Sequence, residues 1–281
     1  WLTVNPTSGI GEHTITFTAE ANSSRASRKA QVKVSATGID SQIIYVTQDG
    51  INTPLNITAG GLKTSLTTDE LANITKLTLT GTIDARDFKT MRDDMPLLTE
   101  IDLSGATISE YTGTGGTSSY VTYYPANEVS ESAFLNQNTY MGKIGLTSVT
   151  LPTSVTSIGR SAFAACFALS NINIPSSVTS IGEGAFASCS SLTAINIPSS
   201  VTSIGVVAFL DCSNLTTVTI PQSVISIGFA AFGRSVSTIN VDVNNPNYSS
   251  IDGVLFNKTQ TKLIQCPYSK TGNYNIPTSV T

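Results

Sequence analysis

A 23-residue repeat, present in four consecutive copies, constrains the fold of this chain more than any other feature. The copies align on Leu146, Leu169, Leu192 and Leu215 and follow the template L-x-x-[VI]-x-[LI]-P-x-S-V-x-S-I-G-x-x-A-F, which ends in x-x-C in the first three. Repetition of this length is typical of a solenoid, in which each copy forms one coil stacked on the next. One coil buries too few apolar side chains to offset the entropy of ordering it, so like side chains must stack in columns. The predicted columns are Val149/Ile172/Ile195/Val218, Leu151/Ile174/Ile197/Ile220, Val155/Val178/Val201/Val224, Ile158/Ile181/Ile204/Ile227 and Phe163/Phe186/Phe209/Phe232.

Each coil is predicted to contain a strand, a turn, an extended segment and a short helical turn. The x-V-x-[LI] stretch alternates polar and apolar residues, which indicates a strand with one face inward. The proline that follows it ends the strand pairing and turns the chain. A second apolar pair, Val155 and Ile158 in the first copy, ends at Gly159, where we expect a left-handed or tightly packed backbone. The A-F-x-x-C stretch has apolar residues at helical spacing.

Three cysteines, Cys166, Cys189 and Cys212, take the same place in successive coils. Neighbouring coils lie roughly 4.8 Å apart, and a disulfide accepts Cα separations of about 4.4–6.8 Å, so distance alone permits a bridge. Stacked side chains point in parallel, however, and three thiols cannot all pair. We therefore expect buried free thiols that pack as small apolar side chains. A metal site is less favoured, because the repeats contain no histidine, and Cys266 is expected to be structural.

The regular copies occupy residues 146–234, between two irregular regions. Residues 51–145 are expected to form an N-terminal cap and irregular repeats, because "ITKLTL" (74–79) and "LTEIDL" (98–103) fit the start of the template. Between these two stretches, a helix is predicted. Its expected cap is Asp84, its inner residues are Phe88, Met91 and Met95, and Pro96 ends it.

The two ends of the chain depart from the repeat. Residues 235–281 are expected to form a β-hairpin insertion, followed at "IPTSVT" by the start of another copy, so we expect the natural protein to continue. Residues 1–50 contain three stretches of strand-like alternation and are similar to part of an immunoglobulin-type β-sandwich.

An enlarged coil at residues 108–134 carries four tyrosines in a Gly/Ser/Thr-rich setting. Aromatic side chains on a loop held by a rigid scaffold are candidates for partner binding. The alternative is that they pack the loop onto the cap, and the sequence leaves both interpretations open. The four residues are Tyr111, Tyr120, Tyr123 and Tyr124.

The outward positions of the predicted strands form a second candidate surface. They fall in two columns on one sheet face, without charge, and could meet an extended peptide or a glycan or simply be solvated. Between residues 146 and 233 the only charged residues are Arg160, Glu183 and Asp211, so binding there should depend weakly on salt. The column positions are Ser148, Thr150, Asn171, Asn173, Ala194, Asn196, Thr217 and Thr219, of which Thr150, Asn171, Asn173, Asn196, Thr217 and Thr219 are the candidate binding residues.

The sequence offers little support for catalysis or for a cofactor. Charged residues make up 12% of the chain and the net charge is −4, so there is no basic field to attract nucleic acid. The only histidine is His13, and no nucleophile motif accompanies it. The Gly-rich "GTGG" (113–116) lacks the lysine of a phosphate loop. We therefore expect no enzyme activity, no cofactor and no metal.

Acidic residues near the predicted helix are numerous enough to supply a glycosidase pair. Helix capping and a solvated helix face account for most of them, so we do not favour catalysis. These residues are Asp84, Asp87, Asp93, Asp94, Glu100 and Asp102.

The repeat I-P-S-S-V-T-S-I-G-x-x-A-F-x-x-C resembles the BspA-type leucine-rich repeat of Bacteroidetes surface proteins. The first segment, "WLTVNPTSG" through "NSSRASRKAQVKV" to "IIYVTQDG", resembles the C-terminal half of a BACON domain. The resemblance implies a β-rich α/β repeat fold: a leucine-rich-repeat solenoid with short helical turns, preceded by a partial immunoglobulin-like β-sandwich.

The same resemblance implies a function. It indicates a secreted or cell-surface bacterial protein of the outer membrane, held by a lipid anchor outside this chain. It also implies adhesion to host matrix proteins, such as fibronectin and fibrinogen, or to neighbouring cells. Two alternatives stay open. One is a carbohydrate-binding accessory protein of a glycan-uptake system, for which Tyr120, Tyr123 and Tyr124 would supply aromatic platforms, and the other is a passive surface spacer.

Overall fold

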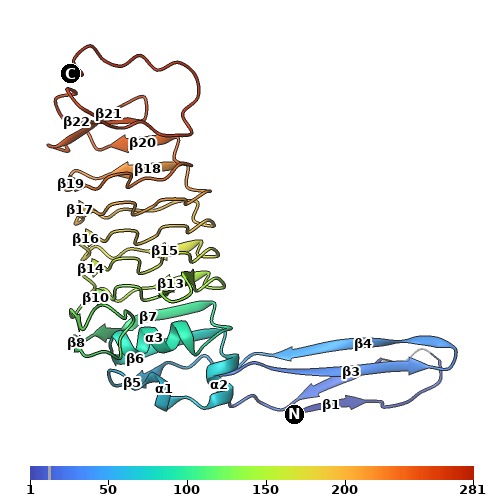
Figure 1. The fold of residues 1–281 in the computed structure, drawn as a ribbon. Coiled ribbons are helices and arrows are strands. Elements are labelled where there is room, and N and C mark those ends of the chain that lie inside the picture. The colour runs from blue at the N-terminus through green and yellow to red at the C-terminus, as the bar shows by residue number, and fades with distance from the viewer. Residues whose placement is uncertain (12–13) are drawn as a thin grey trace.

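Two antiparallel strand pairs precede a single column of stacked coils (Figure 1). The computed structural model describes residues 1–11 and 14–281, so His13 lies outside the described residues. The strand pairs extend away from the column as a partial β-sandwich, in agreement with the sequence prediction (Figure 1). They consist of β1 (Leu2–Asn5) with β2 (Thr16–Ala19), and β3 (Arg28–Ala36) with β4 (Ile39–Gln48).

A parallel sheet follows one side of the column, with strand order β15-β13-β7-β6-β5. Its strands are β5 (Leu55–Ile57), β6 (Lys76–Ile83), β7 (Glu100–Ile108), β13 (Ser148–Thr150) and β15 (Asn171–Asn173). Ser148 pairs with Glu100 on one side and with Asn171 on the other, so the register follows the sequence repeat. Residues 194–196 are not in a strand, and the next coils form a separate parallel pair, β18 (Thr217–Ile220) with β20 (Thr238–Val241).

The predicted extended segments of successive coils pair with one another and form a second parallel sheet. It contains β10 (Glu128–Val129), β14 (Ser157–Ile158), β16 (Ser180–Ile181), β17 (Ser203–Ile204) and β19 (Ser226–Ile227). The glycine that ends each segment lies against the backbone of the preceding coil. A Cβ atom on Gly182 would lie 2.8 Å from both Arg160 N and Gly159 C. Close approach of two coils therefore explains this glycine.

The structure corrects two predictions for the coil: the strand is absent from the third regular coil, at residues 194–196, and the short helical turn is not a helix. Residues 159–166, and the equivalent residues of the other coils, form consecutive β-turns, which we call the turn ribbon. Ala162, Ala164 and Cys166 each donate N–H to the carbonyl three residues earlier, at 3.2–3.3 Å. Ser161 and Ala165 have φ angles of 51° and 55°, in the left-handed region, which prevents a helix.

The left-handed residues allow alternate N–H groups of the turn ribbon to point toward the next coil. Ser161, Phe163 and Ala165 donate to the carbonyls of Glu183, Ala185 and Ala187, each at 2.8 Å. A helix would use these N–H groups internally. The turn ribbon therefore serves as a third line of hydrogen bonds between coils.

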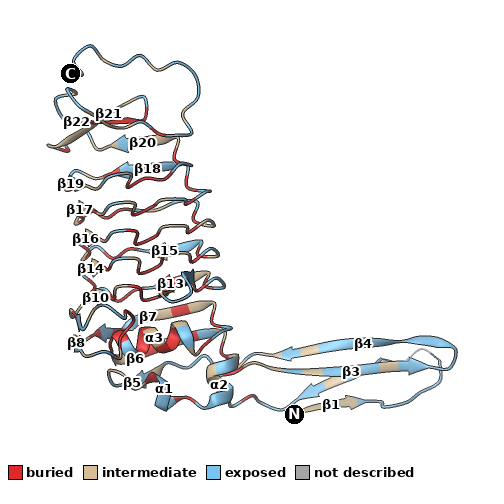
Figure 2. Cartoon of the chain, viewed as in Figure 1, coloured by how far each residue is buried: buried red, intermediate tan, exposed pale blue. Residues whose placement is uncertain are grey.

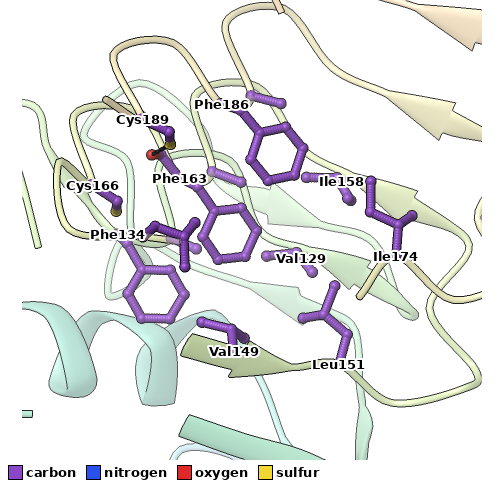
Figure 3. Packing of buried hydrophobic residues seen from close by; sticks show 14 of the residues in the cluster. Val129, Phe134, Val149, Leu151, Ile158, Phe163, Cys166, Ile174, Phe186 and Cys189 are labelled. Carbon is purple, nitrogen blue, oxygen red and sulfur yellow. Dashed lines mark hydrogen bonds between the residues drawn. The ribbon is translucent and has the colours of Figure 1, made fainter. Parts of the chain in front are cut away.

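The core of the column is continuous and built from the predicted apolar columns (Figure 2). Phe163, Phe186 and Phe209 are fully buried and stacked, with successive ring centroids 5.3 and 5.4 Å apart and nearly parallel planes. Figure 3 shows the first part of this stack, from Phe134 through Phe163 to Phe186. Phe134 and Phe232 extend the stack at its two ends. Like side chains thus stack as the repeat predicts.

The predicted helix lies in the first coils of the column, between β6 and β7 in the chain. Helix α3 (Ala85–Asp93) begins at Asp84, whose side chain accepts from Arg86 N at 2.8 Å and takes part in a capping box with Asp87. Phe88, Met91 and Met95 are all fully buried, as predicted, but the helix ends at Asp93, so Met95 lies beyond it and Pro96 does not mark its end. Two shorter helices, α1 (Leu62–Ser65) and α2 (Thr68–Asn73), precede it.

Short antiparallel pairs form the irregular coils. In the enlarged coil these are β8 (Tyr111–Thr112) with β9 (Tyr123–Tyr124), and β11 (Leu135–Asn136) with β12 (Met141–Gly142). Near the C-terminus the predicted hairpin is present as β22 (Val254–Asn257) and β23 (Leu263–Gln265), and β21 (Tyr248–Ile251) adds a third strand.

Candidate functional site

The outward columns of the sheet lie at the surface, as predicted. We call them the sheet face. Flanking side chains point inward: Val149 and Val218 are 2% and 1% exposed. Ser148 is partly exposed and Ala194 is exposed. The exposed candidate binding residues are Thr150, Asn171, Asn173, Asn196, Thr217 and Thr219. The face therefore offers short hydroxyl and amide groups without charge across the regular coils.

The two columns continue into the cap, where they become charged. Strand pairing places Lys76 and Glu100 in the column of Ser148, and Thr78 and Asp102 in the column of Thr150. Lys76 Nζ lies 2.9 Å from Glu100 Oε1, and this contact raises the pKa of the lysine. A hollow of about 200 Å³ lies here. Aligning "ITKLTL" and "LTEIDL" with the template would have identified these residues.

The tyrosines of the enlarged coil divide into two pairs, and the prediction of a binding role is wrong for Tyr124. Its side chain is 2% exposed, and its hydroxyl donates to the carbonyl of Ser118 or Val121, each at 3.1 Å. Tyr111 stacks on it with ring centroids 6.0 Å apart, and the Arg86 guanidinium lies 4.6 Å from the Tyr111 centroid. This pair packs the loop onto the cap, because an aromatic side chain in a Gly/Ser-rich loop supplies its main buried surface.

The other two tyrosines are exposed. Tyr120 is 87% exposed and Tyr123 is 54% exposed. Tyr120 lines a groove with Glu131, Gln137, Tyr140 and other residues that the sequence did not indicate. Glu131, Gln137 and Tyr140 come from an irregular coil and a hairpin, where no repeat fixes their neighbours in space. The 23-residue period therefore gave no signal for them.

The acidic residues near the cap have structural partners. Asp87 accepts from the backbone N–H groups of Gly60, Leu62 and Asp84 at 2.7–2.9 Å. Burial nevertheless raises its pKa. Four others form ion pairs: Asp84 with Arg86, Asp93 with Arg92, Asp94 with Lys63 and Glu100 with Lys76. Asp102 accepts from the backbone N–H of Ser104 at 2.9 Å.

The three stacked cysteines are buried free thiols, as expected. Cys189 Sγ donates to the carbonyl of Phe163 at 3.2 Å, and Cys212 Sγ to that of Phe186 at 3.1 Å. Burial raises the pKa of Cys166 and Cys212 to about 12 and that of Cys189 well above its usual value. Cys266, by contrast, is exposed. The stacked thiols thus stay protonated and unreactive at neutral pH.

The part of the chain that the structure describes holds no metal-binding cluster and no membrane-spanning helix. Within residues 1–11 and 14–281, no cluster of three or more His, Cys, Asp and Glu side chains could hold a metal ion. Among the helices that the structure describes, none has the length and hydrophobicity needed to cross a membrane.

Two protein-family models match parts of this chain. The model of the BspA-type leucine-rich repeat region matches residues 133–270 in six copies, and the model of the BACON N-terminal domain matches residues 1–49. A search of curated proteins finds no match.

Several solved structures are similar to parts of the chain. The T. pallidum leucine-rich repeat protein is 36% identical over 41% of this chain and 52% of its own, with a TM-score of 0.37. A leucine-rich cell surface protein of Faecalibacterium prausnitzii is 23% identical over 89% of this chain and 63% of its own, with a TM-score of 0.48. The pneumococcal vaccine antigen PcpA is 17% identical over 92% of this chain and 60% of its own, with a TM-score of 0.47. The chain therefore spans only about half to two thirds of the length of these proteins.

The family matches agree with the geometry, since the stacked coils and the partial sandwich occupy the matched residues. Both families are typically non-catalytic binding modules of cell-surface or extracellular proteins, and leucine-rich repeats mediate protein interactions. Residues 133–270 of this chain thus belong to the BspA-type leucine-rich-repeat family, and residues 1–49 to the BACON family.

Proposed function

We propose that this chain is a non-enzymatic adhesion module of the bacterial cell surface, which binds a host matrix protein or a neighbouring cell through its sheet face. One observation carries the proposal. Thr150 pairs in register with Asn173, and Asn196 and Thr219 take the equivalent positions of the next two copies; all four are exposed on coils whose inner side chains are buried. A rigid array of short polar side chains loses little entropy when a partner binds.

The charges support a partner with an extended uncharged region. Both columns are neutral over the regular coils. In the cap, the column of Thr150 continues to Asp102, and the column of Ser148 continues to Glu100 and Lys76. Polar groups along the neutral part would align a partner chain, and the charged end would fix its direction. A localisation outside the cell, with an anchor beyond this chain, follows from the same proposal.

Fibronectin and fibrinogen, immobilised for surface plasmon resonance, are the probes that test this function. The double variant Asn173→Arg/Thr219→Arg places two long cations on the sheet face and should weaken binding at least about tenfold. Val206→Arg adds a cation at an exposed site on the turn ribbon and should change the Kd less than about twofold. Raising the salt concentration from 50 to 500 mM should likewise change the Kd of the wild-type chain by less than about twofold.

Two results would overturn the proposal. If neither matrix protein nor whole bacterial cells bind the wild-type chain, a passive spacer is the better description. If Val206→Arg weakens binding as much as the double variant, the partner contacts a different face.

A further inference from the structure

A second surface of the molecule has the features of a small-ligand site. The groove beside the enlarged coil has a volume of about 380 Å³, within the range of about 300–1,000 Å³ for such sites. Its lining includes Tyr120 from the enlarged coil, Tyr140 from the turn between β11 and β12, and Arg160 and Ser161 from the turn ribbon. Three separate parts of the chain therefore converge on it.

The two tyrosines contribute little to the fold. Tyr120 and Tyr140 are 87% and 79% exposed, so their rings bury little surface within the chain. The backbone of Tyr140 has φ of 54°, a left-handed conformation that disfavours a bulky side chain. Strain of this kind, with no packing in return, points to a role outside folding.

Hydrogen bonds fix the polar side chains of the groove before any ligand binds. Gln137 Nε2 donates to Ser132 Oγ at 2.8 Å and to Glu131 Oε1 at 3.4 Å. Gln137 Oε1 accepts from Ser119 N at 3.2 Å. In the described part of the chain, Glu131 Oε2 and the hydroxyls of Tyr120 and Tyr140 have no hydrogen-bond partner. These atoms are available to a ligand.

The backbone around the groove is already hydrogen-bonded, which disfavours an extended peptide as ligand. The carbonyls of Ser132 and Leu135 accept from Arg92 Nη1 at 2.9 and 3.0 Å. Ser132 N donates to Arg160 O, and Ser161 N to Glu183 O, each at 2.8 Å. A peptide that adds a strand needs such backbone groups free. Recognition here must use side chains.

We propose that this groove binds an uncharged saccharide. The C–H face of a sugar ring would stack on the exposed rings of Tyr120 and Tyr140. Adjacent hydroxyl groups of the sugar would donate to the Glu131 carboxylate and accept from the Arg160 guanidinium. A carboxylate and a guanidinium can each form two parallel hydrogen bonds with such a pair of hydroxyls. Arg160 also forms an ion pair with Glu183, with 3.2 Å between Nη2 and Oε1. Two carboxylates and one guanidinium give this part of the groove a net negative charge, which disfavours an acidic saccharide and leaves an uncharged one. The site is separate from the sheet face and does not depend on the proposed adhesion function.

A panel of immobilised neutral oligosaccharides, ending in glucose, galactose, mannose or N-acetylglucosamine, tests the proposal with the full chain. We expect the wild type to bind at least one of them. Tyr120→Ala and Tyr140→Ala should each weaken that binding about tenfold or more. Tyr123→Ala is the matched control, because Tyr123 lies in the same loop, is 54% exposed and does not line the groove. It should bind within about twofold of the wild type.

A second variant separates binding from folding. Asparagine tolerates the left-handed backbone, so Tyr140→Asn should keep or raise the melting temperature while it abolishes saccharide binding. The proposal is overturned if no saccharide binds, or if Tyr123→Ala loses as much binding as the groove variants. It is also overturned if the groove variants lose only fibronectin or fibrinogen binding. Retained saccharide binding in Asn173→Arg/Thr219→Arg would show that the two surfaces act separately.

Discussion

At the scale of single residues, the stacked phenylalanines contribute a large share of the stability of the column. Phe186 is fully buried and stacks on Phe163 and Phe209 with interplanar angles of 5° and 3°. Each interior ring thus has an aromatic neighbour on both sides. Loss of one ring leaves a cavity that the two adjacent coils cannot fill without leaving their hydrogen-bonded register.

Phe186→Ala should therefore lower the free energy of unfolding by roughly 3–5 kcal/mol. Urea denaturation followed by circular dichroism measures the change. Phe229→Ala is the control, because Phe229 is 83% exposed and its loss should change stability by less than about 0.5 kcal/mol. Equal effects of the two substitutions would contradict the stacking of the phenylalanines.

At the scale of elements, two glycines two residues apart serve different purposes. Gly182 ends β16 and lies against the preceding coil, where an added Cβ would be 2.8 Å from backbone atoms. Gly184 lies in the turn ribbon with φ of 58°, and an added Cβ would find its nearest neighbour, Ser161 Oγ, at 3.5 Å. At position 182 a side chain has no room, because it would clash with the preceding coil. At position 184 there is room, but the left-handed backbone disfavours any residue with a Cβ.

The two alanine substitutions should accordingly differ. Gly182→Ala forces two coils apart and should cost roughly 1–3 kcal/mol or more, as overpacking does. Gly184→Ala meets no clash and should cost about 1 kcal/mol through the left-handed backbone alone. Thermal unfolding of both variants gives the comparison. If Gly184→Ala lowers the melting temperature more than Gly182→Ala does, the result would contradict the close contact between Gly182 and the preceding coil.

The sequence predicted the elements whose cause is local and repeated. The strand, the proline turn and the second extended segment follow from alternation and from proline chemistry, and the structure confirms them, except that the strand is absent at residues 194–196. The turn ribbon was missed, because Ser161 and Val207 adopt positive φ although neither is a glycine. Hydrogen bonds to the next coil hold them there, and a helical spacing of apolar residues does not reveal that.

For the candidate site, the sequence predicted the exposed sheet face but only part of the tyrosine cluster. Tyr124 is buried and Tyr120 exposed, although both lie in the same polar loop. Which tyrosine packs depends on Arg86 and Tyr111, and these contacts arise from the folding of the cap. Long-range contacts of this kind leave no periodic trace in the sequence.

At the scale of the whole molecule, each coil contacts mainly its two neighbours, so the column should tolerate the loss of one complete period. Deleting the 23 residues 182–204 joins Ile181 to Gly205 and places Phe163 next to Phe209 in the same register. We expect a folded protein with unchanged circular dichroism per residue and a lower urea midpoint, because one interface between coils is lost.

A deletion of 11 residues, 182–192, is the matched control for the coil deletion. It removes fewer residues but brings unlike side chains into each column, so it should prevent folding of the repeats. If the shorter deletion is tolerated as well as the complete period, the coils do not stack as interchangeable units.

The hydrogen bonds between coils, such as those from the turn ribbon, connect each coil to the next along the column. A stretching force applied to the two ends would break the interfaces between coils one after another, so the coils would unfold in succession. Each released coil of 23 residues would add roughly 70 Å of slack, at about 3.3 Å per extended residue. A cell held through such a chain would therefore be on an extensible tether, which yields in steps under tension and shortens again when the force falls.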